Sequence, residues 1–84
     1  MEIFYHPDFQ KEYRTLPEHI QRLAEKKESI FRKNPFDRRL KTHKLHGGLV
    51  TFYSWSINQQ YRILFRILNN TVRFLSVGTH DIYK

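Results

Sequence analysis

The sequence predicts an α+β domain, β-α-α-β-β-β in order, with a mainly antiparallel, curved sheet and two helices packed on one of its faces. Two changes of periodicity support this class. Apolar residues recur every three to four positions between residues 8 and 33, as in amphipathic helices. Apolar and polar residues alternate between residues 61 and 68, as in half-buried strands. The length of 84 residues predicts a single domain over 1–84.

The first half is expected to contain a short strand and an αα-hairpin. Residues 2–6 form the expected strand, and Pro7 suits the first position of a helix. A second helix begins next to Pro17 and ends before Pro35, because the residue that precedes a proline avoids the helical region. The two helices therefore occupy the region near residues 8–33.

The second half is expected to contain three strands, because β-branched and aromatic residues are frequent there and proline is absent. Gly47-Gly48 predicts a turn before the first strand, and Asn69-Asn70 predicts a tight hairpin turn between the last two. The expected strands cover residues 49–57, 61–68 and 71–77.

A two-residue loop at Asn69-Asn70 also fixes the register of this hairpin. Phe65 then lies opposite Phe74 on the core side, and Arg66 lies opposite Arg73 on the other side. Like charges in direct opposition destabilise a hairpin by a few tenths to about 1 kcal/mol. Two interpretations follow: the arginines extend into water, or an anion occupies this face.

The charge distribution predicts an anionic partner. The formal net charge is +7, from 15 Lys and Arg against 8 Asp and Glu. Positive charge is concentrated between Arg32 and His46, where Asp37 is the single acid. Such a patch attracts nucleic acid, which favours an anionic partner over the alternative that the charge only keeps the protein in solution. The residues expected to bind RNA are Arg38, Arg39, Lys41, Lys44, His46, Arg66 and Arg73.

Several classes of protein are excluded. Without cysteine there are no disulfides and no thiolate metal sites. No apolar run is long enough to span a membrane, and no signal peptide is recognisable, so we expect a cytoplasmic protein. A zinc site from His43, His46 and His80 is conceivable, but the cationic surroundings disfavour a dication. We therefore expect no metal and no cofactor.

The remaining chemistry is acid–base catalysis on a phosphodiester. Arg62, His80 and Tyr83 are expected at the same end of the sheet. Arginine binds phosphate through its planar fork, histidine moves protons near neutrality, and tyrosine stacks on a base. RNA brings its own nucleophile, the 2′-hydroxyl, so the protein needs only to align it, neutralise the developing charge and protonate the leaving oxygen.

Three stretches carry a family resemblance: Leu40–Gly47, Tyr61–Phe65 and Ser76–Tyr83. Together they resemble the RelE/ParE superfamily of type II toxin–antitoxin toxins, most closely the RelE, YoeB and YafQ types, which are ribosome-dependent mRNA endoribonucleases. The resemblance covers essentially the whole chain. It implies a RelE-like fold, a metal-independent reaction and a 2′,3′-cyclic phosphate product.

The resemblance also implies roles for individual residues. Arg62 would bind the scissile phosphate, and His80 would act on the phosphate or as the general acid. His43 is the first choice for the general base, with His46 the second, and Tyr83 would stack on the mRNA base near the cut.

The implied partners are mRNA, the ribosome at its A site with 16S rRNA, and a cognate acidic antitoxin. Operator DNA would be contacted only through the antitoxin. Two alternatives stay open: a ParE-type toxin that poisons DNA gyrase without catalysis, and a non-catalytic RNA-binding domain.

One geometric requirement follows from the proposed site. Strict alternation places Gly78 and His80 on the face opposite Arg62. Because one extra residue reverses the alternation, we expect a β-bulge at Gly78 that brings His80 to the side of Arg62.

Overall fold

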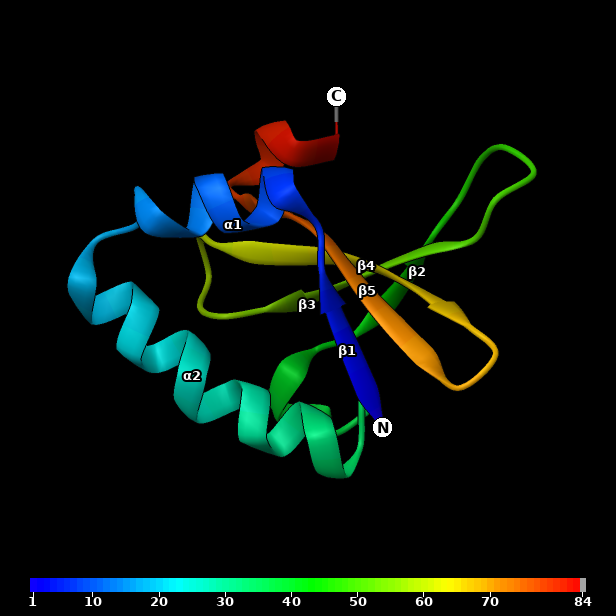
Figure 1. Cartoon of the computed structure of the whole chain (residues 1–84), viewed down its shortest axis with the longest axis horizontal. Coiled ribbons are helices and arrows are strands. Elements are labelled where there is room, and N and C mark those ends of the chain that lie inside the picture. Colours follow the sequence, from blue (N-terminus) through cyan, green and yellow to red (C-terminus); the bar gives the residue numbers. More distant parts are fainter. Residues whose placement is uncertain (84) are drawn as a thin grey trace.

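The computed structural model describes residues 1–83; Lys84 and the side chain of Tyr83 lie outside the described residues. Strands, α-helices and short 3-10 helices follow one another along the chain (Figure 1). In chain order the elements are β1 (Glu2–Tyr5), α1 (Pro7–Arg14), α2 (Glu18–Lys33), η1 (Arg38–Leu40), β2 (His43–Leu45), β3 (Phe52–Ser56), β4 (Arg62–Leu68), β5 (Thr71–Gly78) and η2 (His80–Tyr83).

The strands form one mixed sheet in the order β1-β5-β4-β3-β2. β1 runs parallel to β5, and the other neighbouring pairs in the described chain are antiparallel. The predicted α+β class, with both helices supplying the core on one face, is confirmed. The sheet has one strand more than predicted, because β2 is only three residues long and so short a segment shows no periodicity.

The helix boundaries follow from local sequence signals. α1 begins at Pro7, and the backbone N–H of Asp8 donates to Nδ1 of His6 at 3.0 Å. α2 ends at Lys33, and the next residue, Asn34, is extended with φ −158°. Both boundaries agree with the predictions made from proline. No helix in the described part of the chain is long and apolar enough to cross a bilayer.

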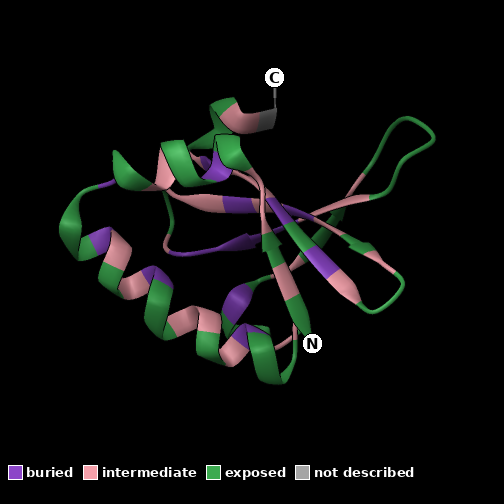
Figure 2. Ribbon diagram, viewed as in Figure 1, coloured by how far each residue is buried: buried purple, intermediate pink, exposed green. Residues whose placement is uncertain are grey.

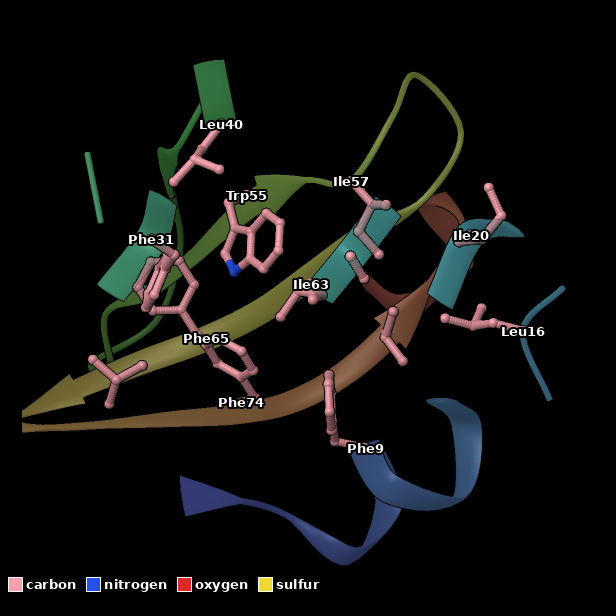
Figure 3. Close-up of a cluster of buried hydrophobic side chains, with 13 residues drawn as sticks. Phe9, Leu16, Ile20, Phe31, Leu40, Trp55, Ile57, Ile63, Phe65 and Phe74 are labelled. Carbon is pink, nitrogen blue, oxygen red and sulfur yellow. The ribbon is translucent and has the colours of Figure 1, made fainter. Parts of the chain in front are cut away.

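Aromatic rings from α2 and the sheet form the centre of the core (Figure 3), and Figure 2 shows buried positions along α2 and the strands. The ring of Phe31 lies 5.0 Å from that of Phe65, 5.2 Å from that of Phe74 and 5.7 Å from that of Trp55. All four side chains are fully buried. Burying one such side chain contributes roughly 1.5–3 kcal/mol, and edge-to-face ring pairs add about 0.5–1.5 kcal/mol each. This cluster holds α2 and the central strands as one rigid support.

The hairpin of β4 and β5 has the predicted register over its outer half. Phe65 lies opposite Phe74, and Arg66 lies opposite Arg73. Asn69 adopts a left-handed conformation with φ 55° at the turn. Asparagine tolerates that conformation better than most residues, which explains why this short turn determined the pairing.

A carboxylate from α1 completes the edge of β5 where β1 ends. β1 pairs with β5 only as far as Tyr5. Beyond that point, Glu12 accepts hydrogen bonds from the Ser76 hydroxyl at 2.8 Å and from the Val77 backbone N–H at 3.1 Å. A buried unpaired N–H is costly, so Glu12 both satisfies the edge and fixes α1 beside the end of β5.

Candidate nucleic-acid interface

A β-bulge in β5 determines which side chains reach the outer face, the side of the sheet away from the helices. Phe65 lies opposite Phe74, whereas the neighbouring Leu64 lies opposite Ser76. Leu75 is therefore the extra residue. The prediction of a bulge at Gly78 was wrong in position, because the extra residue occurs earlier in the strand.

The bulge nevertheless changes the face on which the last residues of β5 lie. Beyond it the alternation is reversed, so Val77 points into the core and Gly78 pairs with Arg62 on the outer face. The end of β5 thus reaches the same face as Arg62.

The 3-10 helix η2 folds over this end of the outer face. A Cβ built on Gly78 would lie 2.8 Å from Cγ2 of Ile82, so only glycine permits such close packing. His80 begins η2 and is exposed. It is thus not buried beneath α1 or α2, a position that would have excluded a role in catalysis.

Arg62 is half-buried at the start of β4. Its Nη1 lies 3.4 Å from both the Ser56 hydroxyl and the Gln59 carbonyl oxygen. Both contacts are long, and among the described residues no carboxylate forms an ion pair with Arg62. Most donors of the guanidinium fork therefore stay available for an anion.

His43 lies on the outer face next to a buried hydroxyl. β2 pairs with β3 so that His43 lies opposite Ser54, and His43 Nε2 is 3.5 Å from Ser54 Oγ. His43 Nδ1 is 3.3 Å from the Lys41 carbonyl oxygen. Because a carbonyl only accepts, this contact places a proton on Nδ1, so that the tautomer used when the ring is neutral is the Nδ1–H form. Nε2 then carries the lone pair that a general base needs.

A hollow of about 340 Å³ lies on the outer face between β2 and η2. His46 lines it, together with Phe52, Leu64 and Ile82. Its walls are mostly apolar, and it is flanked by Arg66, whose guanidinium carbon lies 5.9 Å from the centre of the Phe52 ring. An apolar wall beside cationic groups is a surface on which a nucleic-acid base can stack.

Arg66 and Arg73 do lie directly opposite each other, as predicted. Their side chains diverge, however. Arg66 lies over the Phe52 ring on one side, and the guanidinium carbon of Arg73 lies 5.5 Å from the Phe4 ring centre on the other. These cation–π contacts offset the repulsion, so stability does not require an anion between them. Both arginines lie toward the turn end of the hairpin, away from Arg62.

The basic segment divides among several surfaces. Arg39 forms a two-fold contact with Asp37, at 2.9 Å for both Nε–Oδ1 and Nη2–Oδ2. These hydrogen bonds lower the pKa of Asp37 to about 2. Arg38 is exposed in η1, and Lys41 follows η1 in a left-handed conformation with φ 52°. Lys44 lies opposite Tyr53 on the helix side.

Lys44 therefore does not join the outer face that carries His43, and the expected continuous basic wall over residues 38–46 is divided. Arg62 lies opposite Gly78, the residue of β5 that η2 follows closely, and His43 lies on the same face opposite Ser54. Tyr83 continues η2, but its side chain lies outside the described residues. Among the described residues, no three His, Asp or Glu side chains group as potential metal ligands.

The sequence analysis assigned Ser54 no role, yet the structure places its hydroxyl against His43. Recognising it would have required the register of β2 with β3. Lys27 was also missed, because its position in a helical charge pattern gives no sign that it approaches Arg62 across a hollow.

No protein-family model matches the chain, and no curated protein sequence matches it. Solved structures do match its fold over nearly its whole length. The YoeB/ParE toxin from Agrobacterium tumefaciens superposes with a TM-score of 0.80 at 14% identity, covering 95% of this chain and 99% of that one. YafQ from E. coli strain BL21(DE3) superposes with a TM-score of 0.79 at 15% identity, covering 98% of this chain and 96% of that one.

A chain of the RelB-RelE antitoxin-toxin complex from Methanococcus jannaschii gives a TM-score of 0.77 at 20% identity, covering 96% of this chain and 95% of that one. The chain therefore has the fold of a class of small α+β toxins. More particularly, its fold is the one shared by RelE, YafQ and YoeB, as the three sequence stretches had indicated.

Proposed function

We propose that this chain is the toxin of a type II toxin–antitoxin pair and that it cleaves mRNA on the ribosome. The observation that supports the proposal is that Arg62 and His43 lie on the outer face, with η2 following Gly78, the residue opposite Arg62. Among the described residues, Arg62 has no acidic partner. The shared toxin fold supports the toxin role.

The proposed reaction uses the RNA 2′-hydroxyl as the nucleophile. His43 accepts the 2′-hydroxyl proton at Nε2 as this oxygen attacks the adjacent phosphorus. Arg62 neutralises the charge that develops on the phosphorane oxygens. His80 donates a proton to the departing 5′-oxygen, which leaves a 2′,3′-cyclic phosphate and a 5′-hydroxyl end. Tyr83 is proposed to stack on the base next to the cut.

The proposed partners follow from charge. Ribosomal RNA and mRNA are polyanions, and a small domain with net charge +7 binds them through released counterions. A flexible acidic antitoxin would cover the same cationic surface and fold on binding. Relatives of the same fold have been solved as antitoxin–toxin complexes. Contact with operator DNA would be made by the antitoxin.

A ParE-type gyrase poison is the second candidate, because one structure of the same fold is described as a YoeB/ParE toxin. The two functions differ in what induction does inside a cell. A nuclease depletes mRNA and leaves new 5′ ends, whereas a gyrase poison provokes DNA damage and leaves transcripts intact.

The test is induction of wild type, Arg62→Ala and His80→Ala, with mRNA 5′ ends mapped after growth arrest. Each variant is expected to relieve arrest and remove the new ends while keeping the wild-type circular dichroism spectrum. Arg22→Ala is the matched control, because Arg22 is an exposed α2 residue paired with Glu18. The residue roles are wrong if folded Arg62→Ala and His80→Ala still arrest growth with the same cleavage ends. The nuclease proposal is wrong if growth arrest by the wild type leaves no new mRNA 5′ ends.

A further inference from the structure

A second hollow, of about 330 Å³, lies at the edge of the sheet on the other side of Arg62. It is lined by α2, by η1 with the residue that follows it, and by the turn between β3 and β4. Its basic lining residues are Lys27, Arg39, Lys41 and Arg62, and no carboxylate of the described residues lines it.

Three of these four cations form no salt bridge with another described residue. Asp37 binds the guanidinium of Arg39, but the salt bridges among the described residues include none of Lys27, Lys41 and Arg62. Burial lowers the pKa of Lys27, and the nearby charge of Lys41 lowers it further. Holding these charges together is unfavourable for the protein alone.

The rim of the hollow adds neutral donors. Asn58 Oδ1 accepts from the backbone N–H groups of Gln60 at 2.9 Å and Tyr61 at 2.8 Å. The carbonyl of this amide is thus committed to the turn, and its NH₂ group is the part left to meet a ligand. Cations with amide donors and no acid are the composition of an anion site.

We propose that this hollow binds a backbone phosphate of the RNA strand next to the phosphate held by Arg62 on the outer face. The inference rests on the proposed nuclease function. Arg62 lies on the outer face and also lines the hollow. Because an RNA strand carries one phosphate per nucleotide, a strand bound at Arg62 presents a neighbouring phosphate to the hollow. Lysine ammonium groups bind such a phosphate as point charges, while arginine provides the directional fork.

The same chemistry would attract a carboxylate of an acidic antitoxin. The phosphate is favoured because the hollow is continuous with Arg62, so one strand can satisfy both positions. Bound this way, the RNA would be held on two sides of the scissile linkage, which restricts its rotation before attack.

The test compares Lys27→Gln with Lys26→Gln. The two lysines are adjacent on α2 and the substitutions remove the same charge, but Lys26 is exposed and does not line the hollow. The probe is a short 2′-O-methyl oligoribonucleotide, which lacks the nucleophile and is not cleaved. Its affinity is measured against salt concentration for each variant.

Lys27→Gln is expected to weaken binding about tenfold and to reduce the slope of log affinity against log salt by about 0.7, the value for one phosphate contact to a single strand. Lys26→Gln should leave the affinity and the salt slope near their wild-type values, and Lys27→Arg, which keeps the charge, should bind like the wild type. Equal losses for Lys27→Gln and Lys26→Gln would overturn the phosphate site.

A second arm uses polyglutamate in place of RNA. If Lys27→Gln weakens polyglutamate binding but not oligonucleotide binding, the hollow belongs to an acidic protein partner and the proposal is wrong. Because the oligonucleotide cannot be cleaved, the result is independent of catalysis. Intact transcripts after induction of the wild type would refute the nuclease function without changing this measurement.

Discussion

Replacing Gly78 with alanine tests whether the position of η2 controls the chemistry. The new Cβ would lie 2.8 Å from Cγ2 of Ile82, roughly 1 Å inside the usual carbon–carbon contact distance of about 3.5–4.0 Å. The obstructing atom is the γ-methyl on the branched Cβ of Ile82, and β-branched side chains are stiff at χ1. The short helix η2 therefore has to shift, while the rest of the fold should survive. Overpacking costs about 1–3 kcal/mol, and lower freedom of the unfolded chain offsets about 0.4–1 kcal/mol.

The expected effect on activity is larger than the effect on stability. A net loss of about 1–2 kcal/mol lowers the Tm by roughly 4–16 °C for a domain of this size. Displacing a catalytic group by about 1 Å can cost on the order of 100-fold in rate, and His80, the proposed general acid, moves with η2. We therefore expect Gly78→Ala to be folded at 25 °C and to cleave ribosome-bound mRNA about 100-fold more slowly.

Ile82→Ala provides the matched control, because it removes the atom that the new methyl group would meet. The double variant Gly78→Ala/Ile82→Ala should cleave close to the rate of Ile82→Ala alone. A folded Gly78→Ala protein that cleaves at the wild-type rate would refute the coupling between η2 and the chemistry. A double variant as slow as Gly78→Ala would refute the steric explanation.

Two further predictions concern stability. Glu12→Ala removes the acceptor of the Ser76 hydroxyl and the Val77 N–H. It should lower the free energy of unfolding, measured in urea, by about 1.5–3 kcal/mol. An unchanged unfolding midpoint would contradict the role of Glu12 as the acceptor at the edge of β5. Hydrogen bonds from Arg39 lower the pKa of Asp37 from 3.8 to about 2. The stabilisation that the ionised Asp37 provides is therefore present above pH 4 and is lost as the pH falls toward 2. The stability difference between wild type and Asp37→Asn should therefore shrink over that interval, and a difference constant from pH 5 to pH 2 would contradict the pairing.

Local signals made much of the fold predictable. Prolines determined where α1 and α2 begin and end, since they act on the backbone of their immediate neighbours. The turn at Asn69-Asn70 determined that Phe65 lies opposite Phe74, because a short loop permits only one register nearby. The resulting core pairs follow from the alternation of the two strands.

The structure shows the face on which the predicted site residues lie, and the site itself stays a prediction. Arg62 and His43 share the outer face, whereas Lys44 faces the helices and Arg73 lies away with Phe4. These differences arise because the charge of a segment says nothing about the face that each of its residues occupies. The catalytic and RNA-binding roles stay predictions.

The sequence by itself determined the element order through β1, α1, α2 and the last three strands, together with the residue types that suit a phosphate. Only the tertiary structure decided that β2 pairs at the edge, that the bulge falls at Leu75, and that Lys27 approaches Arg62. The physical reason is the distance along the chain over which each interaction acts. Turns, caps and periodicity are set by neighbours along the chain, whereas a bulge and a shared hollow depend on how separate elements fit together in space.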